Sequence, residues 1–210
     1  MILSKLIDGY GKGYTARVSK EGLLNVVVHP HPPREEETSA VPVREYFKTS
    51  AGATDMRVDG STTNVEFYIA AEKDKDKYVK TVSIVIADAL ATLSEFGNLN
   101  AALTNGVVLE WNTTDLGVVT IADALKTNFD FVRLGLGNPA FGDGAGAFRG
   151  GNIVTTSEGY LPVIDFASMF GLPWGLRLRA GTTDKVIFRI RDDVTAIDQF
   201  DAIAYGIKTS

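Results

Sequence analysis

The chain has 210 residues, which is enough for one large domain or two small ones. A chain of this length can bury a substantial hydrophobic core without disulfide bonds. It contains no cysteine, which excludes disulfide scaffolds, cysteine-ligated zinc, iron–sulfur clusters and thiol catalysis. The net charge of −5 argues against general nucleic-acid binding, and two histidines in one short cluster make a Ser–His–Asp triad hard to assemble.

The first fifty residues differ from the rest and predict an extended N-terminal arm. Gly9, Gly11 and Gly13 stand at alternate positions and favour turns over a helix. A short apolar strand, LLNVVV, is followed by HPHPP, whose prolines exclude a central strand and favour polyproline geometry. We therefore expect residues 1–50 to form an arm or anchor, and residues 51–210 to form a separate domain.

A single short strand such as residues 23–28 is not stable alone and must pair with another strand. One option is an exposed sheet edge of a partner, which would make residues 1–45 an anchor. The other option is an edge of the chain's own sandwich. The next strand is expected to begin within residues 41–48, where Pro42 suits an edge position.

From residue 54 onward, short segments rich in β-branched and aromatic residues are separated by turn signals. The predicted strands are residues 64–71, 78–89, 107–111, 118–122, 130–135, 153–156, 160–165, 175–180, 186–191 and 200–207. Helix is scarce and is predicted only at residues 87–96, 123–126 and 167–170. The charged residues 72–77 predict a hairpin turn, and the glycine-rich residues 135–151 predict a long loop. Because βαβ spacing is lacking, the pattern predicts an antiparallel sandwich or barrel with little helix, and of the two we expect a β-sandwich.

The clearest alternation lies in residues 174–180 and 186–191, where apolar and basic side chains take opposite faces. The basic side chains are Arg177, Arg179, Arg189 and Arg191. Residues 181–184 are short enough to join the two strands as a hairpin, which would crowd four guanidiniums on one face. Two outcomes stay equally open: carboxylates of the same chain neutralise the arginines, or an acidic partner surface binds them.

Other motifs favour ordinary structural explanations. His29 and His31 would need further ligands, and although Glu35–Glu37 are close in sequence, a proline-rich arm does not fold back easily, so no metal site is expected. The glycine-rich loop lacks the Lys-Ser/Thr and the strand–helix context of a phosphate-binding loop, but it carries Phe141 and Phe148, which a neighbouring subunit would cover. No carboxylate pair poised against an apolar pocket is identified, as a β-sandwich glycoside hydrolase would require. We therefore predict no catalytic residues, no metal and no cofactor, and hence a protein that is not an enzyme.

The segment Leu6-Ile-Asp-Gly-Tyr-Gly-Lys-Gly-Tyr-Thr-Ala-Arg-Val18, followed by Gly22-Leu-Leu24, resembles the opening of tailed-bacteriophage virion proteins. Those proteins begin with a short Asp-Gly-x-Gly segment, an Ala-x-Val step and a small strand, and then run through a Glu-rich stretch into a β-sandwich. The resemblance implies an auxiliary head protein with a jelly-roll β-sandwich, a capsid decoration or cement subunit that binds and stabilises the lattice of the major capsid protein. It covers the first twenty-five residues, and beyond them it is architectural.

The expected partners follow from this resemblance. We expect a homo-oligomer, a trimer by analogy, made in the host cytoplasm and placed on the capsid exterior of the virion. It would bind the major capsid protein and neither nucleic acid nor a membrane, since no apolar run approaches the roughly 20 residues that span a bilayer. The residues expected to contact the capsid or a neighbouring subunit are Leu23, Leu24, Val26, Val28, Phe141, Phe148, Arg177, Arg179, Arg189 and Arg191.

The alternative function is a tail, baseplate or fibre component that binds a host receptor or a glycan. A cleft lined by Trp111, Trp174 and Tyr160 with two convergent acids would favour glycan binding over capsid cementing.

Overall fold

The computed structural model describes residues 40–87, 92–97, 99–134 and 162–209 in full, and only the backbone of residues 4–7, 13–18, 24–26, 88 and 158–160. The chain divides into two compact units, Met1–Ser39 and Ala40–Ser210. Within the first unit, β1 (Ser4–Ile7), β2 (Gly13–Val18) and β3 (Leu24–Val26) form an antiparallel sheet in the order β1-β2-β3.

The strand expected at residues 23–28 is thus shorter and has a partner inside its own unit. β3 pairs with β2 from Ala16↔Val26 to Val18↔Leu24. Both options for a further partner of this strand, the sheet edge of a partner protein and the chain's own sandwich, stay predictions. The segment expected to be an extended arm therefore contains a small sheet.

The boundary expected at residue 50 lies earlier, after Ser39. β4 (Val41–Tyr46) belongs to the second unit, where it pairs with β13 (Gln199–Lys208). β4 is the end strand of its sheet, so the edge position expected for Pro42 is confirmed.

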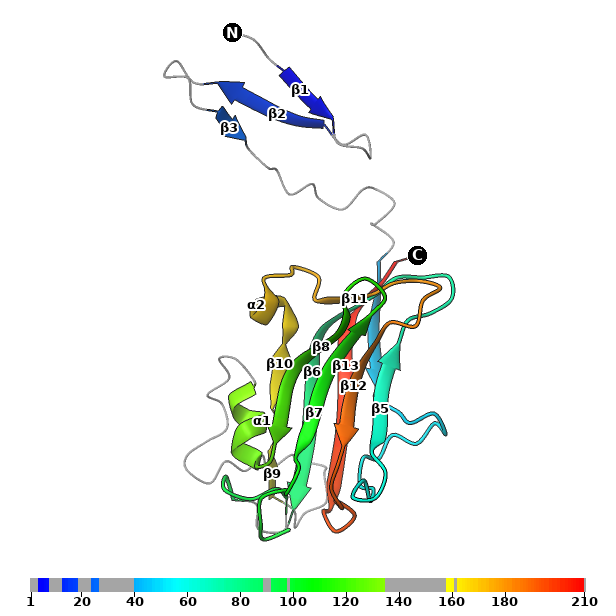
Figure 1. Ribbon diagram of the computed structural model, residues 1–210, viewed down its shortest axis with the longest axis vertical. Coiled ribbons are helices and arrows are strands. Elements are labelled where there is room, and N and C mark those ends of the chain that lie inside the picture. Colours follow the sequence, from blue (N-terminus) through cyan, green and yellow to red (C-terminus); the bar gives the residue numbers. More distant parts are fainter. Residues whose placement is uncertain are drawn as a thin grey trace. The chain divides into compact units, whose positions relative to one another are not determined.

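The second unit is mainly β and consists of two antiparallel sheets around a common core, consistent with the predicted sandwich (Figure 1). The first sheet has the order β10-β6-β13-β4, and β9 and β11 also pair with β6. Its further strands are β6 (Lys77–Asp88), β9 (Glu158–Tyr160), β10 (Val163–Asp165) and β11 (Leu176–Leu178). The second sheet has the order β5-β12-β7-β8, formed by β5 (Val65–Ala70), β7 (Val107–Thr113), β8 (Gly117–Leu125) and β12 (Lys185–Ile190).

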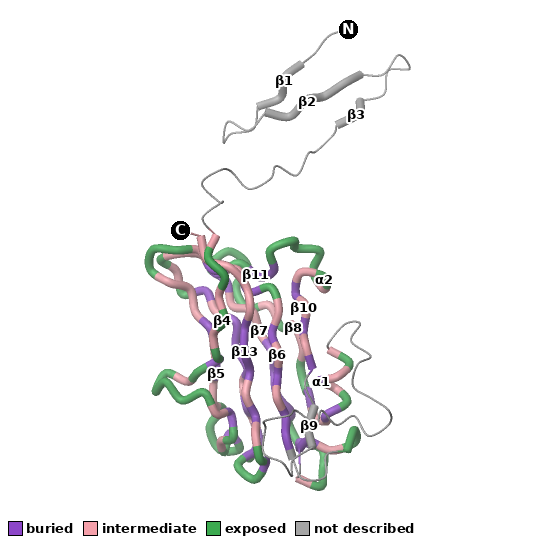
Figure 2. The backbone as a smooth tube through the Cα atoms, turned by 180° about the vertical axis from the view of Figure 1, so that it is seen from behind, coloured by how far each residue is buried: buried purple, intermediate pink, exposed green. Residues whose placement is uncertain are grey.

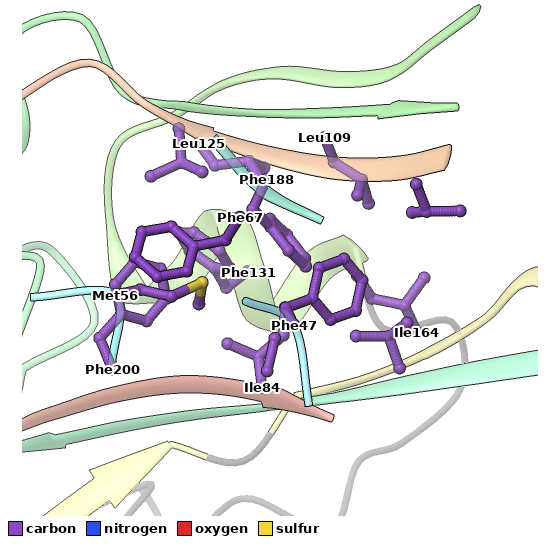
Figure 3. Packing of buried hydrophobic residues seen from close by; sticks show 14 of the residues in the cluster. Phe47, Met56, Phe67, Ile84, Leu109, Leu125, Phe131, Ile164, Phe188 and Phe200 are labelled. Atoms are coloured by element: carbon purple, nitrogen blue, oxygen red, sulfur yellow. The ribbon is translucent and has the colours of Figure 1, made fainter. Parts of the chain in front are cut away.

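Both sheets bury one face because their sequences alternate with a period of two residues. Along β6, Val82, Ile84 and Ile86 are fully buried, whereas the residues between them are only partly covered. Phenylalanines from both sheets fill the layer between them, and the rings of Phe47 and Phe188 lie 5.0 Å apart (Figure 3). Each fully buried side chain of this size contributes about 1.5–3 kcal/mol of hydrophobic free energy. Figure 2 shows the buried stretches concentrated along the strands.

The region after β8 differs from the prediction. Residues 130–135 are not a strand but lie largely in α1 (Asn128–Leu134), and the helical turn expected at residues 123–126 is the end of β8. A capping box explains the helix: the amide of Asp130 donates to the hydroxyl of Thr127, and the Asp130 carboxylate accepts from the amide of Thr127.

Two further local predictions are wrong. The described part of residues 87–96 contains no helix, since β6 runs through Asp88 and residues 92–96 form a turn and bend. Residues 72–77 do not close a hairpin, because β5 and β6 belong to different sheets and the segment crosses between them. The helix expected at residues 167–170 is confirmed as α2 (Phe166–Phe170), with Asp165 as its N-cap.

Candidate interaction surface

The predicted arginine hairpin is wrong, although the alternation that suggested it is real. Leu176 and Leu178 are buried and Arg177 is exposed, but β11 pairs with β6 in the first sheet. β12, which carries Arg189, pairs with β5 and β7 in the second sheet. The short connection between β11 and β12 therefore links two sheets, and the four arginines do not share one face.

Each of these arginines is paired with a carboxylate of the same chain, at N···O distances between 2.5 and 3.0 Å. The pairs are Arg177–Asp76, Arg179–Asp115, Arg189 with both Glu66 and Glu110, and Arg191–Asp123. Of the two outcomes that the sequence left open, neutralisation within the chain is the one observed. Contacts from these arginines to a partner stay a prediction.

The outer face of the second sheet carries a connected charge network. The Nζ of Lys185 lies 3.0 Å from Glu66, and Arg189 lies 2.7 Å from Glu66 and from Glu110. Burial alone would raise the pKa of Glu66, but the hydrogen bonds and charges of Lys185 and Arg189 outweigh it and hold that pKa below its usual value. The network therefore joins two basic side chains to two acidic ones within the same chain.

This network also closes the face to solvent. Ile187 is on the outer side of β12, yet it is only 2% exposed. Its register neighbours are Tyr68 on β5 and Glu110 on β7, and the Nζ of Lys185 lies 5.4 Å from the centre of the Tyr68 ring. Long charged side chains cover apolar surface in this way while their ends stay in water. The outer face of the second sheet therefore presents charged groups that are already paired with one another.

The outer face of the first sheet has a different chemistry. We name its central part the tyrosine face; its residues are Tyr46, Tyr78, Thr81, Ser83, Val163, Ile203, Tyr205 and Ile207. These residues stand opposite one another across strands, in the rows Tyr78–Ile207, Thr81–Tyr205 and Val163–Ser83–Ile203–Tyr46. None of the eight is charged, and Arg44, Asp165, Arg177 and Asp201 border them.

The direction of these side chains follows from what their neighbours do. Val82 and Ile84 of β6 lie in the core cluster, as do Ala202 and Ala204 of β13, so the residues between them face outward. A register shift after Tyr205, where Gly206 pairs with Val79 and Lys80 is passed over, keeps Tyr78 and Ile207 on the same face. The tyrosine face is only partly exposed overall, and Tyr46 is its most open aromatic residue at 40%.

Arg44 joins two tyrosines at the border of this face. A hydrogen bond with the Tyr205 side chain raises the pKa of Arg44, and the guanidinium carbon lies 5.6 Å from the centre of the Tyr46 ring. A tyrosine combines a large apolar ring with a polar hydroxyl, which is why this residue is enriched in protein interfaces. The tyrosine face therefore has a side-chain chemistry that is common in protein interfaces.

The two described tryptophans do not face a common cleft. Trp111 is on the inner side of β7 and packs against the core, and its buried indole N–H has no acceptor among the described residues. Trp174 is 47% exposed in the segment that leads into β11. The side chain of Tyr160 lies outside the described residues, so the cleft that would favour the glycan-binding alternative stays untested.

Several expected site residues fall outside the description. Leu23, Val28, Phe141 and Phe148 lie in segments that are not described, as do the two histidines. Leu24 and Val26 lie in β3, but only their backbone is described. In the part of the chain with described side chains, there is no cluster of three or more potential metal ligands, and no helix there is long and apolar enough to cross a membrane.

Comparisons with protein families, with curated proteins and with solved structures found no match for this chain. The tyrosine face was not expected from the sequence, although a signal for it exists. The segments YVKTVSIVIAD and QFDAIAYGIK alternate, and the outward residues Thr81, Ser83, Ile203, Tyr205 and Ile207 carry no charge. What the sequence does not give is that these two segments pair with each other.

Proposed function

We propose that this chain is a non-enzymatic structural subunit of a tailed-phage virion, a capsid decoration or cement protein with a jelly-roll sandwich. The observation that carries the proposal is the strand order. With β9, β10 and β11 taken together as one edge element, the first sheet contains the sixth, third, eighth and first strands of the unit. The second sheet contains the second, seventh, fourth and fifth.

This order supports a jelly roll because it pairs the first strand with the eighth, the second with the seventh, the third with the sixth and the fourth with the fifth. A jelly roll has these four pairings, which arise when one long hairpin wraps into two sheets. Viral capsid domains are a large class of jelly rolls, and this agrees with the resemblance of the N-terminal segment to phage virion proteins. Fold alone does not specify function, so the attachment surface needs its own argument.

We propose the tyrosine face as the surface that docks on the major capsid protein. The charged face of the second sheet has its ionic groups already paired, whereas the tyrosine face offers aromatic rings, hydroxyls and aliphatic side chains without charge to desolvate. Assembly as a homotrimer on the capsid exterior stays part of the proposal, by analogy with jelly-roll virion proteins.

The test is co-sedimentation of the purified protein with capsids of the phage that encodes it, followed by fractionation of intact virions. Tyr205→Ser and Ile207→Ser should each weaken capsid binding by about tenfold or more, as expected for residues central to an interface. Lys185→Ala on the charged face is the matched control and should bind as the unaltered chain does. Recovery of the protein with tails alone would favour the receptor- or glycan-binding alternative and contradict the proposal.

A further inference from the structure

The outer edge of β4 offers main-chain groups that pair with no described strand. β4 is the end strand of the first sheet, and no described strand pairs with its far edge between Val41 and Tyr46. Its residues are mostly exposed, with Val41 at 51% and Tyr46 at 40%. An exposed edge strand is a template on which a further strand can add through main-chain hydrogen bonds.

The backbone directions identify which groups face outward. The amide of Phe47 donates to the carbonyl of Ala202 on β13 at 2.9 Å, so Phe47 faces the sheet. Alternate residues of a strand face opposite edges, so Arg44 and Tyr46 direct their N–H and C=O groups away from β13. Lys48, the next residue of this set, confirms the direction, because its amide and carbonyl bond to Tyr68 of β5 at 3.3 and 3.0 Å.

The same set of residues fixes the length of the open edge. At one end Pro42 has no N–H to donate, and at the other end Lys48 is already paired. Between them, Arg44 and Tyr46 offer two donors and two acceptors, enough for a short added strand. β8, the end strand of the second sheet, is less suitable, because it is irregular at two places and Ala124 has a φ of 53°.

The charge of the edge indicates the chemistry of its partner. Arg44 and Lys48 are both exposed, and neither forms an ion pair with a carboxylate among the described residues. The arginines of β11 and β12, in contrast, are all paired with carboxylates. Carboxylates on an incoming strand would lie close to these two cations and attract them, whereas basic side chains on that strand would be repelled.

We propose that the outer edge of β4 binds an extended acidic segment of a partner protein, which adds to the first sheet as a further strand beside Arg44 and Tyr46. This inference deepens the proposed function and rests on it only for the source of the segment, a capsid or neighbouring virion protein. The added strand lies next to the tyrosine face, so one partner can contact both the edge and the face.

The probe is a synthetic peptide of about eight residues in which Glu alternates with Val. Two control peptides separate charge from strand addition: one replaces each Glu with Lys, and the other keeps the Glu residues but has Pro in place of the central Val. Fluorescence anisotropy measures binding to the full chain. Hydrogen exchange of the Arg44 and Tyr46 amides reports whether these two groups become bonded.

The acidic peptide should bind, the lysine peptide should not, and the proline-interrupted peptide should bind at least about tenfold more weakly, because proline cannot continue the ladder. Exchange at Arg44 and Tyr46 should slow on addition of the acidic peptide. Equal binding of the two acidic peptides, or unchanged exchange at both amides, would show attraction without an added strand and would overturn the inference.

Variants of the chain give a second measurement. Tyr46→Pro removes an outward amide, as Pro42 already does without loss of the ladder to β13, and it should abolish binding. Arg44→Gln removes charge alone and should weaken binding about fivefold. Arg57→Gln removes a cation that is paired with Asp55, away from this edge, and should bind normally. Thermal unfolding establishes that each variant folds. If Tyr46→Pro does not fold, the hydrogen-exchange measurement on the unaltered chain still tests the inference.

The outcomes separate this inference from the proposed function. If the tyrosine-face variants lose capsid binding but the acidic peptide does not bind, the inference about the β4 edge is wrong and the proposed function is retained. Binding of the peptide by a protein that is absent from capsids overturns the proposed function alone. Slow exchange at Arg44 and Tyr46 in a peptide-free dimer would show that a second copy occupies the edge, which also overturns the inference.

Discussion

Lys77 and Glu45 form an ion pair between strands that are not neighbours in their sheet. The Nζ of Lys77 lies 2.7 Å from the Oε2 of Glu45, although β13 separates β6 from β4. The same ammonium donates to the carbonyl of Ala70 on β5 at 3.1 Å, and Glu72 lies 3.4 Å away. Lys77, whose side chain is only 3% exposed, therefore ties the two sheets together at one end of the sandwich.

Replacing this lysine should destabilise the fold. Lys77→Ala leaves two carboxylates and the Ala70 carbonyl without their shared donor, and we expect the free energy of unfolding to fall by about 2–3 kcal/mol. Lys77→Met keeps an apolar stem in the same space and should lose less. Urea unfolding measures both, and Lys75→Ala, at an exposed position on the same connection, should change little. An unchanged midpoint for Lys77→Ala contradicts this account.

Asp184 should make stability depend on acid pH. Burial alone would raise its pKa, but the hydroxyl and amide of Thr114 and the amide of Arg179 donate to the carboxylate and hold the pKa below its usual value. A carboxyl whose pKa is lowered by folding stabilises the protein above its unfolded pKa of about 4, and this contribution disappears as pH falls through the lower, folded value.

Asp184→Asn should therefore be less stable than the unaltered chain at pH 7 and should show a flatter loss of stability between about pH 5 and pH 3. Unfolding in urea at a series of pH values measures the slope. Glu66, whose pKa is also lowered, should keep part of the acid dependence in the variant. Parallel pH curves for the two proteins would show that Asp184 is not the titrating group.

The alternation of side chains located most strands correctly, because it depends only on local spacing. Residues 64–71, 186–191 and 200–207 lie on β5, β12 and β13 to within two residues at each end. The partners of these strands could not be predicted from local sequence, since β13 pairs with β6 across more than a hundred residues of chain. The arginine hairpin failed for the same reason: a short connection can turn between two sheets as readily as within one.

The helix α1 was missed although its signal was present. Thr127 and Asp130 have the spacing of a capping box, and residues 130–135 contain phenylalanine and valine that also suit a strand. The tyrosine face required the register between β6 and β13 and the shift after Tyr205, neither of which follows from local sequence. The strands could thus be predicted from the alternation of side chains in the sequence, whereas the candidate surface depends on how the strands pair in the structure.

Gly206 should not tolerate a side chain. It lies at the register shift of β13, where an added Cβ would come within 1.7 Å of the Tyr78 carbonyl oxygen. Because the obstacle is backbone, Gly206→Ala should lower the free energy of unfolding by about 3 kcal/mol or more. Gly52→Ala is the control: it has no atom within 4 Å but a φ of +85°, and it should lose only about 1 kcal/mol. Thermal unfolding compares the two, and equal losses would contradict the steric argument.

Asp192 organises the turn that leads into β7. Its carboxylate accepts hydrogen bonds from three successive amides, those of Thr104 and Asn105 at 3.1 Å and that of Gly106 at 2.7 Å. Asp192 is only 8% exposed, so water cannot easily replace the carboxylate.

Asp192→Ala should lower the free energy of unfolding by about 2–4 kcal/mol, because it leaves buried donors without an acceptor, and Asp192→Asn should lose less, since one acceptor oxygen remains. The neighbouring Asp193 accepts at its carboxylate from the amide and hydroxyl of Thr195 at an exposed position, so Asp193→Ala is the matched control and should lose clearly less. Hydrogen exchange of the amides of residues 104–106 gives the local readout: they should exchange faster in Asp192→Ala and at the original rate in Asp193→Ala. Unchanged exchange at all three amides in Asp192→Ala would show that the turn does not depend on this carboxylate.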